Sequence, residues 1–352
     1  MEIVLHSFGA RLRVKDGLFK IIVPDLTGAG LEQEETFPAH EISTVLLQPG
    51  TSVSSDALLY ALEHDTDVIV LDRLGNPSGR LLPNRPSTTL NIWKNQLALS
   101  GTPHALRFAR QWILQKIRHQ LAFLQKLKAY RTAQKVEQIE RAEAALGDAH
   151  ARLARLSLTD GPLEQIAASI RGLEGHAARP YWPLLSQLLP AEYQFNGRSR
   201  QPSNDLFNAF INYGYGILYR HVENALWRAG LHPYIGFHHV DNYQRKSMVF
   251  DFIEPYRVWV DHYTFNLFAA KKVQRAHADE LAGGGWWLNR EGKRLVQTEF
   301  AERFTTKRYE HADGKTYPLG GLMRVHAVAF AAALNRGMEE ALQVPLASAL
   351  NT

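Results

Sequence analysis

The sequence of 352 residues contains no cysteine. This absence excludes a disulfide-bonded scaffold, a cysteine-ligated zinc site and a thiol nucleophile, and it is consistent with a reducing, cytoplasmic location. Long apolar runs are also missing, because no stretch approaches the ~20 apolar residues that a membrane-spanning helix needs. The first ten residues, MEIVLHSFGA, have neither a basic leader nor an apolar run, so we expect no signal peptide.

Acidic residues are missing from one long part of the chain. Between Arg73 and Val136 there is no Asp or Glu, whereas the same stretch contains twelve Lys and Arg residues. A basic stretch of this kind is typical of proteins that bind a polyanion, and it favours nucleic acid as the partner. The alternative is a solvated helix face whose charge is balanced by acids elsewhere in the fold.

The first 75 residues have the pattern of a small β-rich domain. Strands are predicted at 11–24, 42–48 and 67–72, and a short helix at 54–64. Asp16-Gly17 is typical of a hairpin turn, and Ser54 or Ser55 is the expected helix cap. Gly, Pro, Ser and Asn then become so frequent that we interpret 76–90 as a linker.

The remaining chain has helical periodicity, with apolar residues mostly three and four positions apart. The expected helices cover 104–158, 163–178, 203–229, a segment capped by Ser247, and 321–335. Pro180 is expected to end the second of them. We interpret the charged segment 137–155 as an exposed helical hairpin tip. The sequence therefore predicts an α+β protein with an N-terminal β-rich domain (1–75), a linker (76–90) and a large α-helical domain (91–352).

Glu174 is the first candidate site residue, because it borders an apolar helical face. It stands next to Leu173 and four residues after Ile170. An ionised carboxylate in such a setting needs a nearby cation or a metal. The alternative is a boundary glutamate that pairs with Arg171 or Arg179.

Asp251 and Glu254 form a second candidate group, in the apolar segment SMVFDFIEPYR. They are three residues apart, so on one helix they share a face and can converge on one ion such as Mg²⁺ or Mn²⁺. Alternatively, they interact with the helix dipole, and Glu254 pairs with Arg257. The adjacent His238 and His239 point in different directions if the segment is extended, so we expect at most one to reach a metal.

Together and in order, these blocks resemble the family of CRISPR spacer-acquisition integrases, Cas1, over nearly the whole chain. The resemblance is strongest in RGLEGHAARPYW (171–182), NGRSRQPSNDLFNAFINYGYGILY (196–219) and AGLHPYIGFHHVDNYQRKSMVFDFIEPYR (229–257). The helical glutamate of the family falls on Glu174, the histidine of its GF-x-H pattern on His239, and its D-x-x-[DE] pair on Asp251 and Glu254. The segments 137–155 and 283–294 receive no role from this resemblance.

The resemblance implies a metal-dependent DNA endonuclease and integrase that uses Mg²⁺ or Mn²⁺. Glu174, His239 and Asp251 are the implied catalytic metal ligands, with Glu254 as a further ligand or a support. The implied reaction is transesterification, in which the 3′-hydroxyl of a short DNA fragment attacks a phosphodiester of the CRISPR array. The implied partners, in a prokaryotic cytoplasm, are DNA with double-stranded, branched or 3′-overhanging ends, a second copy bound through the N-terminal domain, and the small ferredoxin-like protein Cas2.

The basic residues are the candidate DNA contacts, and we expect them to hold phosphates with little reading of sequence. They are Arg107, Arg110, Lys116, Arg118, Lys126, Lys128, Arg198 and Arg200. Two other functions stay open at this point. One is a general metal-dependent nuclease or branched-DNA resolvase, in which water replaces the 3′-hydroxyl. The other is a non-catalytic architectural DNA-binding subunit, although the intact Glu, His and Asp set argues against it.

Overall fold

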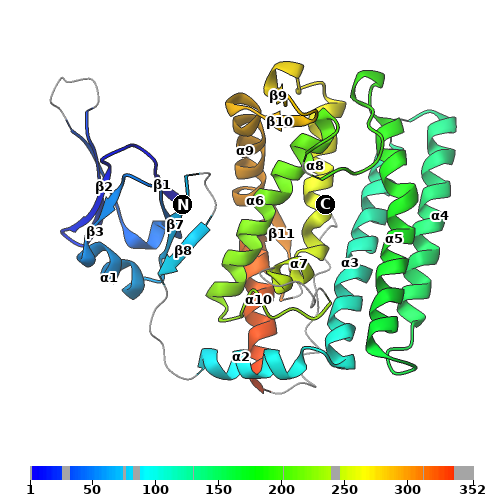
Figure 1. Ribbon diagram of the computed structural model, residues 1–352, viewed down its shortest axis with the longest axis horizontal. Helices are drawn as coiled ribbons and strands as arrows, with labels where there is room; N and C mark the ends of the chain where they lie inside the picture. Colours follow the sequence, from blue (N-terminus) through cyan, green and yellow to red (C-terminus); the bar gives the residue numbers. More distant parts are fainter. Residues whose placement is uncertain are drawn as a thin grey trace. The chain divides into compact units, whose positions relative to one another are not determined.

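Figure 1 shows the computed structural model, in which N-terminal strands precede a largely helical body. This architecture confirms the predicted α+β fold class. The structure describes residues 2–25, 32–73, 77–81, 88–129, 131–200, 202–238, 246–311 and 313–336. The chain divides into two units, Met1–Pro86 and Ser87–Thr352, which are described in turn. Within these described ranges, no helix is long and apolar enough to cross a membrane.

The first unit contains two four-stranded sheets and the helix α1 (Ser55–Glu63). One sheet has the order β1 (Glu2–Leu5), β5 (Thr44–Leu47), β7 (Asp67–Leu71) and β8 (Pro77–Leu81), with β8 antiparallel and the others parallel. The other has the order β4 (Gln33–Phe37), β3 (Leu18–Val23), β2 (Arg11–Lys15) and β6 (Ser52–Val53). The single-turn helix η1 (Ala39–Glu41) follows β4. These elements share one apolar core, which includes Leu12, Phe19 and Val45.

Two local predictions in this unit are confirmed. Asp16 and Gly17 join β2 to β3 with φ angles of 52° and 69°, the left-handed conformation that a tight hairpin turn requires. Ser54 caps α1, and its side chain accepts a hydrogen bond from the backbone N–H of Ala57.

The predicted linker 76–90 is partly wrong, because β8 lies inside it. This strand pairs with β7 along the edge of the sheet, and Arg80 forms an ion pair with Asp67 at 3.1 Å. Pro77 stands at the first position of an edge strand, where the missing N–H costs no ladder hydrogen bond. The Gly-, Pro- and Ser-rich composition indicated an irregular linker, but residues 77–81 of it form an edge strand. Residues 74–76 and 82–87 lie outside the described part.

The second unit is a helical body with two small hairpins (Figure 1). Its longer helices are α2 (Thr88–Leu99), α3 (Pro103–Lys128), α4 (Ala133–Arg155), α5 (Leu163–Leu188), α6 (Leu206–Arg228), α8 (Arg257–Ala269), α9 (Arg290–Thr305) and α10 (Leu319–Arg336). Short helices are η2 (Ala191–Tyr193), α7 (Ser247–Phe252), η3 (Glu254–Tyr256) and η4 (Arg275–His277). The hairpins are β9 (Ala278–Glu280) with β10 (Trp286–Leu288), and β11 (Arg308–Glu310) with β12 (Thr316–Pro318). One large apolar core joins these helices.

Helix α5 does not end at Pro180, contrary to the sequence prediction. The helix is 26 residues long and ends at Leu188, with both Pro180 and Pro183 inside it. Each proline removes one helical hydrogen bond, but Leu184 and Leu185 beyond them are buried in the core. Packing of this apolar end therefore outweighs the local preference of proline.

The prediction that 137–155 is an exposed hairpin tip is also wrong. Helix α4 packs along α3 and α5, as the three parallel ribbons in Figure 1 show. Ile139, Leu146 and Leu153 on its inner face are fully buried. Their spacing of seven is a helical stripe, which the many charges on the other face obscured in the sequence. Helix α4 thus supports the two helices that carry the candidate site.

Candidate active site

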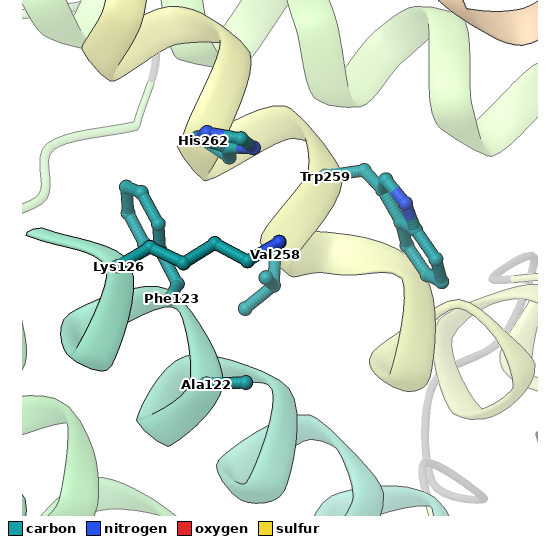
Figure 2. Close-up of a pocket in the computed structure, with 6 residues that line it drawn as sticks. All are labelled: Ala122, Phe123, Lys126, Val258, Trp259 and His262. Atoms are coloured by element: carbon teal, nitrogen blue, oxygen red, sulfur yellow. The ribbon is translucent and has the colours of Figure 1, made fainter. Parts of the chain in front are cut away.

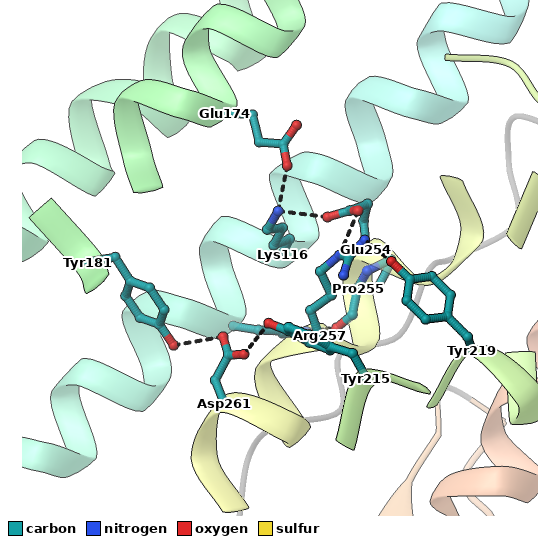
Figure 3. Close-up of polar contacts among 10 residues, drawn as sticks. Lys116, Glu174, Tyr181, Tyr215, Tyr219, Glu254, Pro255, Arg257 and Asp261 are labelled. Carbon is teal, nitrogen blue, oxygen red and sulfur yellow. Dashed lines mark hydrogen bonds and ion pairs between the residues drawn. The ribbon is translucent and has the colours of Figure 1, made fainter. Parts of the chain in front are cut away.

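Two glutamate side chains from separate elements meet at the ammonium group of one lysine (Figure 3). Lys116 of α3 donates hydrogen bonds from Nζ to Glu174 Oε1 of α5 at 2.5 Å and to Glu254 Oε2 of η3 at 2.7 Å. Glu174 is one of the predicted residues, and its partner is Lys116 rather than Arg171 or Arg179. The structure therefore brings together two of the four predicted carboxylate and histidine residues, through a lysine that the sequence had suggested as a DNA contact.

Glu254 is fixed on several sides. Arg257 Nε donates to Glu254 Oε1 at 2.7 Å, so the predicted pairing of these two residues is confirmed. The next residue is held as well, since His119 Nδ1 donates to the Pro255 carbonyl oxygen at 2.6 Å. Tyr256 then forms a 2.6 Å hydrogen bond with His326 Nδ1. These contacts fix the backbone that presents the Glu254 carboxylate.

Burial and charge determine the electrostatics of this cluster. The Glu254 side chain is 5% exposed and that of Glu174 is 25% exposed. Burial alone raises the pKa of Glu254, but the Arg257 guanidinium and the Lys116 ammonium outweigh it and lower that pKa to about 2. Burial likewise works against the charged form of Lys116, but Glu174 and Glu254 outweigh it and raise the pKa of Lys116. Glu254 and Lys116 are therefore ionised at neutral pH.

Asp251 holds a stretch of backbone. Its Oδ2 atom accepts hydrogen bonds from the backbone N–H groups of Phe237 at 2.6 Å and His238 at 3.0 Å. Asp251 and Glu254 stand three residues apart across the junction of α7 and η3, where Ile253 keeps right-handed helical backbone angles. That the two carboxylates converge on one ion stays a prediction. The predicted cap at Ser247 is wrong by one position, because α7 begins at Ser247 and its N-cap residue is Lys246.

His239, the predicted histidine ligand, lies outside the described residues. Asp251 nevertheless holds the two peptide N–H groups directly before it. The chain is tight at this point, since a Cβ atom on Gly236 would lie 2.4 Å from Ser247 Cβ. Asp251 therefore fixes the backbone that leads to His239, a role that the sequence pattern did not reveal.

A second set of aromatic and charged side chains lies next to the cluster (Figure 3). The Tyr215 and Tyr181 hydroxyls donate to the two oxygens of buried Asp261 at 2.5 and 3.0 Å. The Arg257 guanidinium lies 5.1 Å from the ring centre of Tyr215, and its Nη2 donates to the Tyr219 hydroxyl at 2.9 Å. The sequence analysis missed Asp261, although an acid in the apolar run RVWVDHYTF was a usable signal.

Burial raises the pKa of Asp261 from its ordinary 3.8 to about 6, and the two tyrosine hydroxyls oppose this shift only in part. Between pH 3.8 and about 6 the folded protein holds a proton on Asp261 that the unfolded chain has released. The free energy of unfolding therefore falls as the pH rises through this range, and the loss is complete above pH 6. We expect the stability difference between Asp261→Asn and wild type to move in favour of the variant by roughly 2–3 kcal/mol from pH 4 to 7.

Urea unfolding followed by tryptophan fluorescence measures this difference, because every tryptophan of the chain lies in the second unit. An exposed variant on the loop before α5, Asp160→Asn, serves as the control. A stability difference that does not change with pH would contradict the assignment for Asp261.

The candidate DNA contacts occupy different settings. Arg118, Lys126 and Arg200 are exposed, and Arg107 is half-buried. Arg110 donates to the Leu156 carbonyl oxygen, Lys128 forms ion pairs with Glu140 and Glu143, and Arg198 donates to Asn208 and Asn212. Lys116 belongs to the glutamate cluster. The exposed members of the set are thus the ones whose charges are directed to solvent.

A shallow pocket lies between α3 and α8 (Figure 2). Its lining residues are Ala122, Phe123, Lys126, Val258, Trp259 and His262. Because this lining contains no carboxylate, it does not have the character of a site for a hard cation.

The donor chemistry of the glutamate cluster fits a small divalent cation. In the part of the chain that the structure describes, no three His, Asp or Glu side chains gather in the manner of a metal site. Two carboxylates from α5 and η3 nevertheless already converge on a single positive charge. Carboxylate oxygens are the ligands that Mg²⁺ and Mn²⁺ prefer.

Comparison with known proteins places the chain in a family. The family model described as "CRISPR associated protein Cas1" matches residues 3–302. The chain belongs to the Cas1 family. A Cas1 relative named a CRISPR-associated endonuclease, from Thermus thermophilus, is 31% identical over 335 residues, covering 95% of this chain and 96% of the relative.

Solved structures have the same fold as this Cas1 chain. A casposase bound to an integration product superposes with a TM-score of 0.71 at 22% identity, covering 95% of this chain and 90% of that chain. A chain of a Cas6-RT-Cas1–Cas2 complex superposes with a TM-score of 0.69 at 21% identity, covering 97% of this chain and 35% of that one. At such identities the likeness shows the fold alone. The resemblance to Cas1 that the sequence indicated is confirmed.

Proposed function

We propose that this protein is a CRISPR adaptation integrase, which inserts short DNA fragments into the CRISPR array. Membership of the Cas1 family supports the proposal, as do the endonuclease name of its relative and the integration product bound by the similar casposase. The observation that carries it is the convergence of Glu174 and Glu254, from two helical elements, on one cation.

Glu174 and Glu254 are the residues that would hold a Mg²⁺ or Mn²⁺ ion, with His239 and Asp251 as the further residues that the family resemblance implies. When bound, the ion supplies positive charge to a phosphodiester under attack and favours deprotonation of the attacking hydroxyl. Arg257 holds Glu254 in place, and Asp251 fixes the backbone before His239. Arg118, Lys126 and Arg200 are available to hold phosphates without reading bases.

The proposed assembly is a homodimer that binds DNA and Cas2. A Cas1–Cas2 complex among the similar structures supports the Cas2 partner. Exposed apolar residues on the parallel sheet of the first unit, Val4 and Val70, support contact with a second copy. The proposal places the protein in the prokaryotic cytoplasm.

The reaction type is tested with DNA fragments whose 3′ ends are either free or blocked. We expect the free-ended fragment to be joined to array DNA in the presence of Mn²⁺ or Mg²⁺, and the 3′-deoxy fragment to give no joined product, because transesterification needs the 3′-hydroxyl. Gel electrophoresis of a labelled fragment measures the joining. Cleavage of the array at equal rates with both fragments would show instead that water is the nucleophile, as in a general nuclease or resolvase.

A further inference from the structure

Lys116 occupies the position at which the two glutamates of the site converge. Its Nζ lies 2.5 Å from Glu174 Oε1 and 2.7 Å from Glu254 Oε2 (Figure 3). The side chain is 14% exposed, so its charge is directed into the second unit. It follows Trp112 by four residues on α3, in the stripe that faces the core. The lysine is therefore built into the site and does not belong to the exposed basic surface.

The four charges of the cluster balance without any further ion. Glu174 and Glu254 are matched by Lys116 and Arg257, and Arg257 is bonded to the oxygen of Glu254 that Lys116 does not contact. Glu254 consequently keeps a cationic partner if Lys116 leaves. A second cation between the same two carboxylate oxygens would meet the ammonium at close range, and like charges at such distances repel strongly in a buried site.

We propose that Lys116 is the resident cation of the site, and that a divalent metal ion binds Glu174 and Glu254 only by displacing its ammonium group. This inference rests on the proposed function, because it takes the metal site as given. Lysine suits the role, since its single charge sits on a flexible four-carbon stem that can withdraw while α3 stays in place. Lys116 thereby sets the metal affinity of the enzyme.

Displacement also changes the charge that DNA meets. A neutral cluster gains two positive charges when a divalent ion enters, and one of the cations is then a released ammonium beside the reaction centre. A phosphodiester brings one negative charge and develops more during attack, so this excess is complementary to it. The same lysine thus keeps the two carboxylates together before metal binding and leaves a positive site for phosphate afterwards.

The test compares Mn²⁺ binding by the full-length wild type and Lys116→Met, measured by the loss of the paramagnetic resonance signal of free Mn²⁺. Removal of the competing ammonium should tighten Mn²⁺ binding about tenfold or more, because the ion no longer displaces two charge-assisted hydrogen bonds. Without metal, the same variant should melt at a lower temperature than wild type, and saturating Mn²⁺ should raise its melting temperature by more than that of wild type.

Three further variants make the result specific. Lys116→Arg retains a cation and should bind Mn²⁺ no more tightly than wild type. Lys128→Met removes a lysine of the same helix that pairs with Glu140 and Glu143, and it should leave Mn²⁺ affinity unchanged. Glu174→Gln should lose Mn²⁺ binding, which confirms that the titration reports this site.

The outcomes separate the inference from the function on which it rests. If Lys116→Met binds Mn²⁺ as wild type does, or more weakly, while Glu174→Gln loses binding, the metal site stands and Lys116 is not its competitor. If wild type and Glu174→Gln bind Mn²⁺ equally or not at all, the metal site itself is wrong and the inference falls with it. Should Lys116→Met fail to fold, Lys116→Gln provides the same comparison with a neutral polar side chain.

Discussion

Glu174→Gln should abolish joining of DNA fragments while leaving the protein folded and able to bind DNA. Glutamine keeps the shape of the side chain but removes the negative charge that a metal ligand needs. Loss of an outer-shell partner already lowers metal-site activity roughly 10–100-fold, and we expect loss of Glu174, a direct ligand in the proposed site, to cost more than about a hundredfold. Strand-transfer rates at a Mn²⁺ concentration that saturates wild type measure the effect.

The stability cost of this change should be small, at about 1 kcal/mol or less, because the side chain is partly exposed and Lys116 keeps its bond to Glu254. The matched control is Glu164→Gln, an exposed position in the first turn of the same helix, which should join DNA like wild type. Near-normal joining by Glu174→Gln would remove Glu174 from the metal site.

Glu254→Ala should have the largest effect on stability. The side chain is 5% exposed and pairs with both Lys116 and Arg257, so its removal leaves Arg257 without a carboxylate partner and Lys116 with Glu174 alone. Breaking a buried ion pair in this way costs about 3–5 kcal/mol. Urea unfolding at pH 7, followed by tryptophan fluorescence of the second unit, measures the loss. Glu280→Ala, which removes an exposed partner of Arg275, should cost far less and serves as the control.

The lowered pKa of Glu254 also predicts how the stability of the protein changes with pH. Because the pKa of Glu254 is lowered to about 2 in the fold, its ionic contribution is complete above the ordinary glutamate value of 4.5 and is lost as the pH falls towards 2. The stability advantage of wild type over Glu254→Gln should accordingly be constant from pH 5 to 8 and shrink below 4.5. An advantage that grows on acidification would show that the carboxylate is not the charged partner.

The sequence indicated the importance of Glu174 and Glu254, because a carboxylate beside an apolar stripe can be recognised from the sequence pattern alone. It did not indicate that Lys116 joins them, although Lys116 stands four residues after Trp112 on the buried face of α3. The charge of Lys116 suggested a DNA contact, which stays a prediction, whereas its place on the buried helix face was the signal for a buried partner. Partners on other helices cannot be read from periodicity, since the pattern specifies only that a face is buried.

Asp251 shows the opposite difficulty. Its spacing of three from Glu254 predicts a shared face, and Ile253 keeps right-handed helical angles where α7 gives way to η3. The spacing does not show that the backbone N–H groups of Phe237 and His238 donate to the Asp251 carboxylate. Pro255 marks the change from α7 to η3 in the sequence, but proline did not end α5, so its presence alone decides nothing. At the end of α5 the packing of buried Leu184 and Leu185 outweighs the prolines, and this packing is a property of the folded unit.

The contacts of Lys116 join distant parts of the chain. Glu174 lies 58 positions further along and Glu254 lies 138 positions further along. During synthesis the lysine and the first glutamate emerge long before the second, and closing the longer loop must await the helices between them. An incomplete or partly unfolded chain therefore lacks the paired carboxylates that the proposed metal site requires. Under the proposed function, the architecture restricts DNA cleavage and joining to molecules that have finished folding.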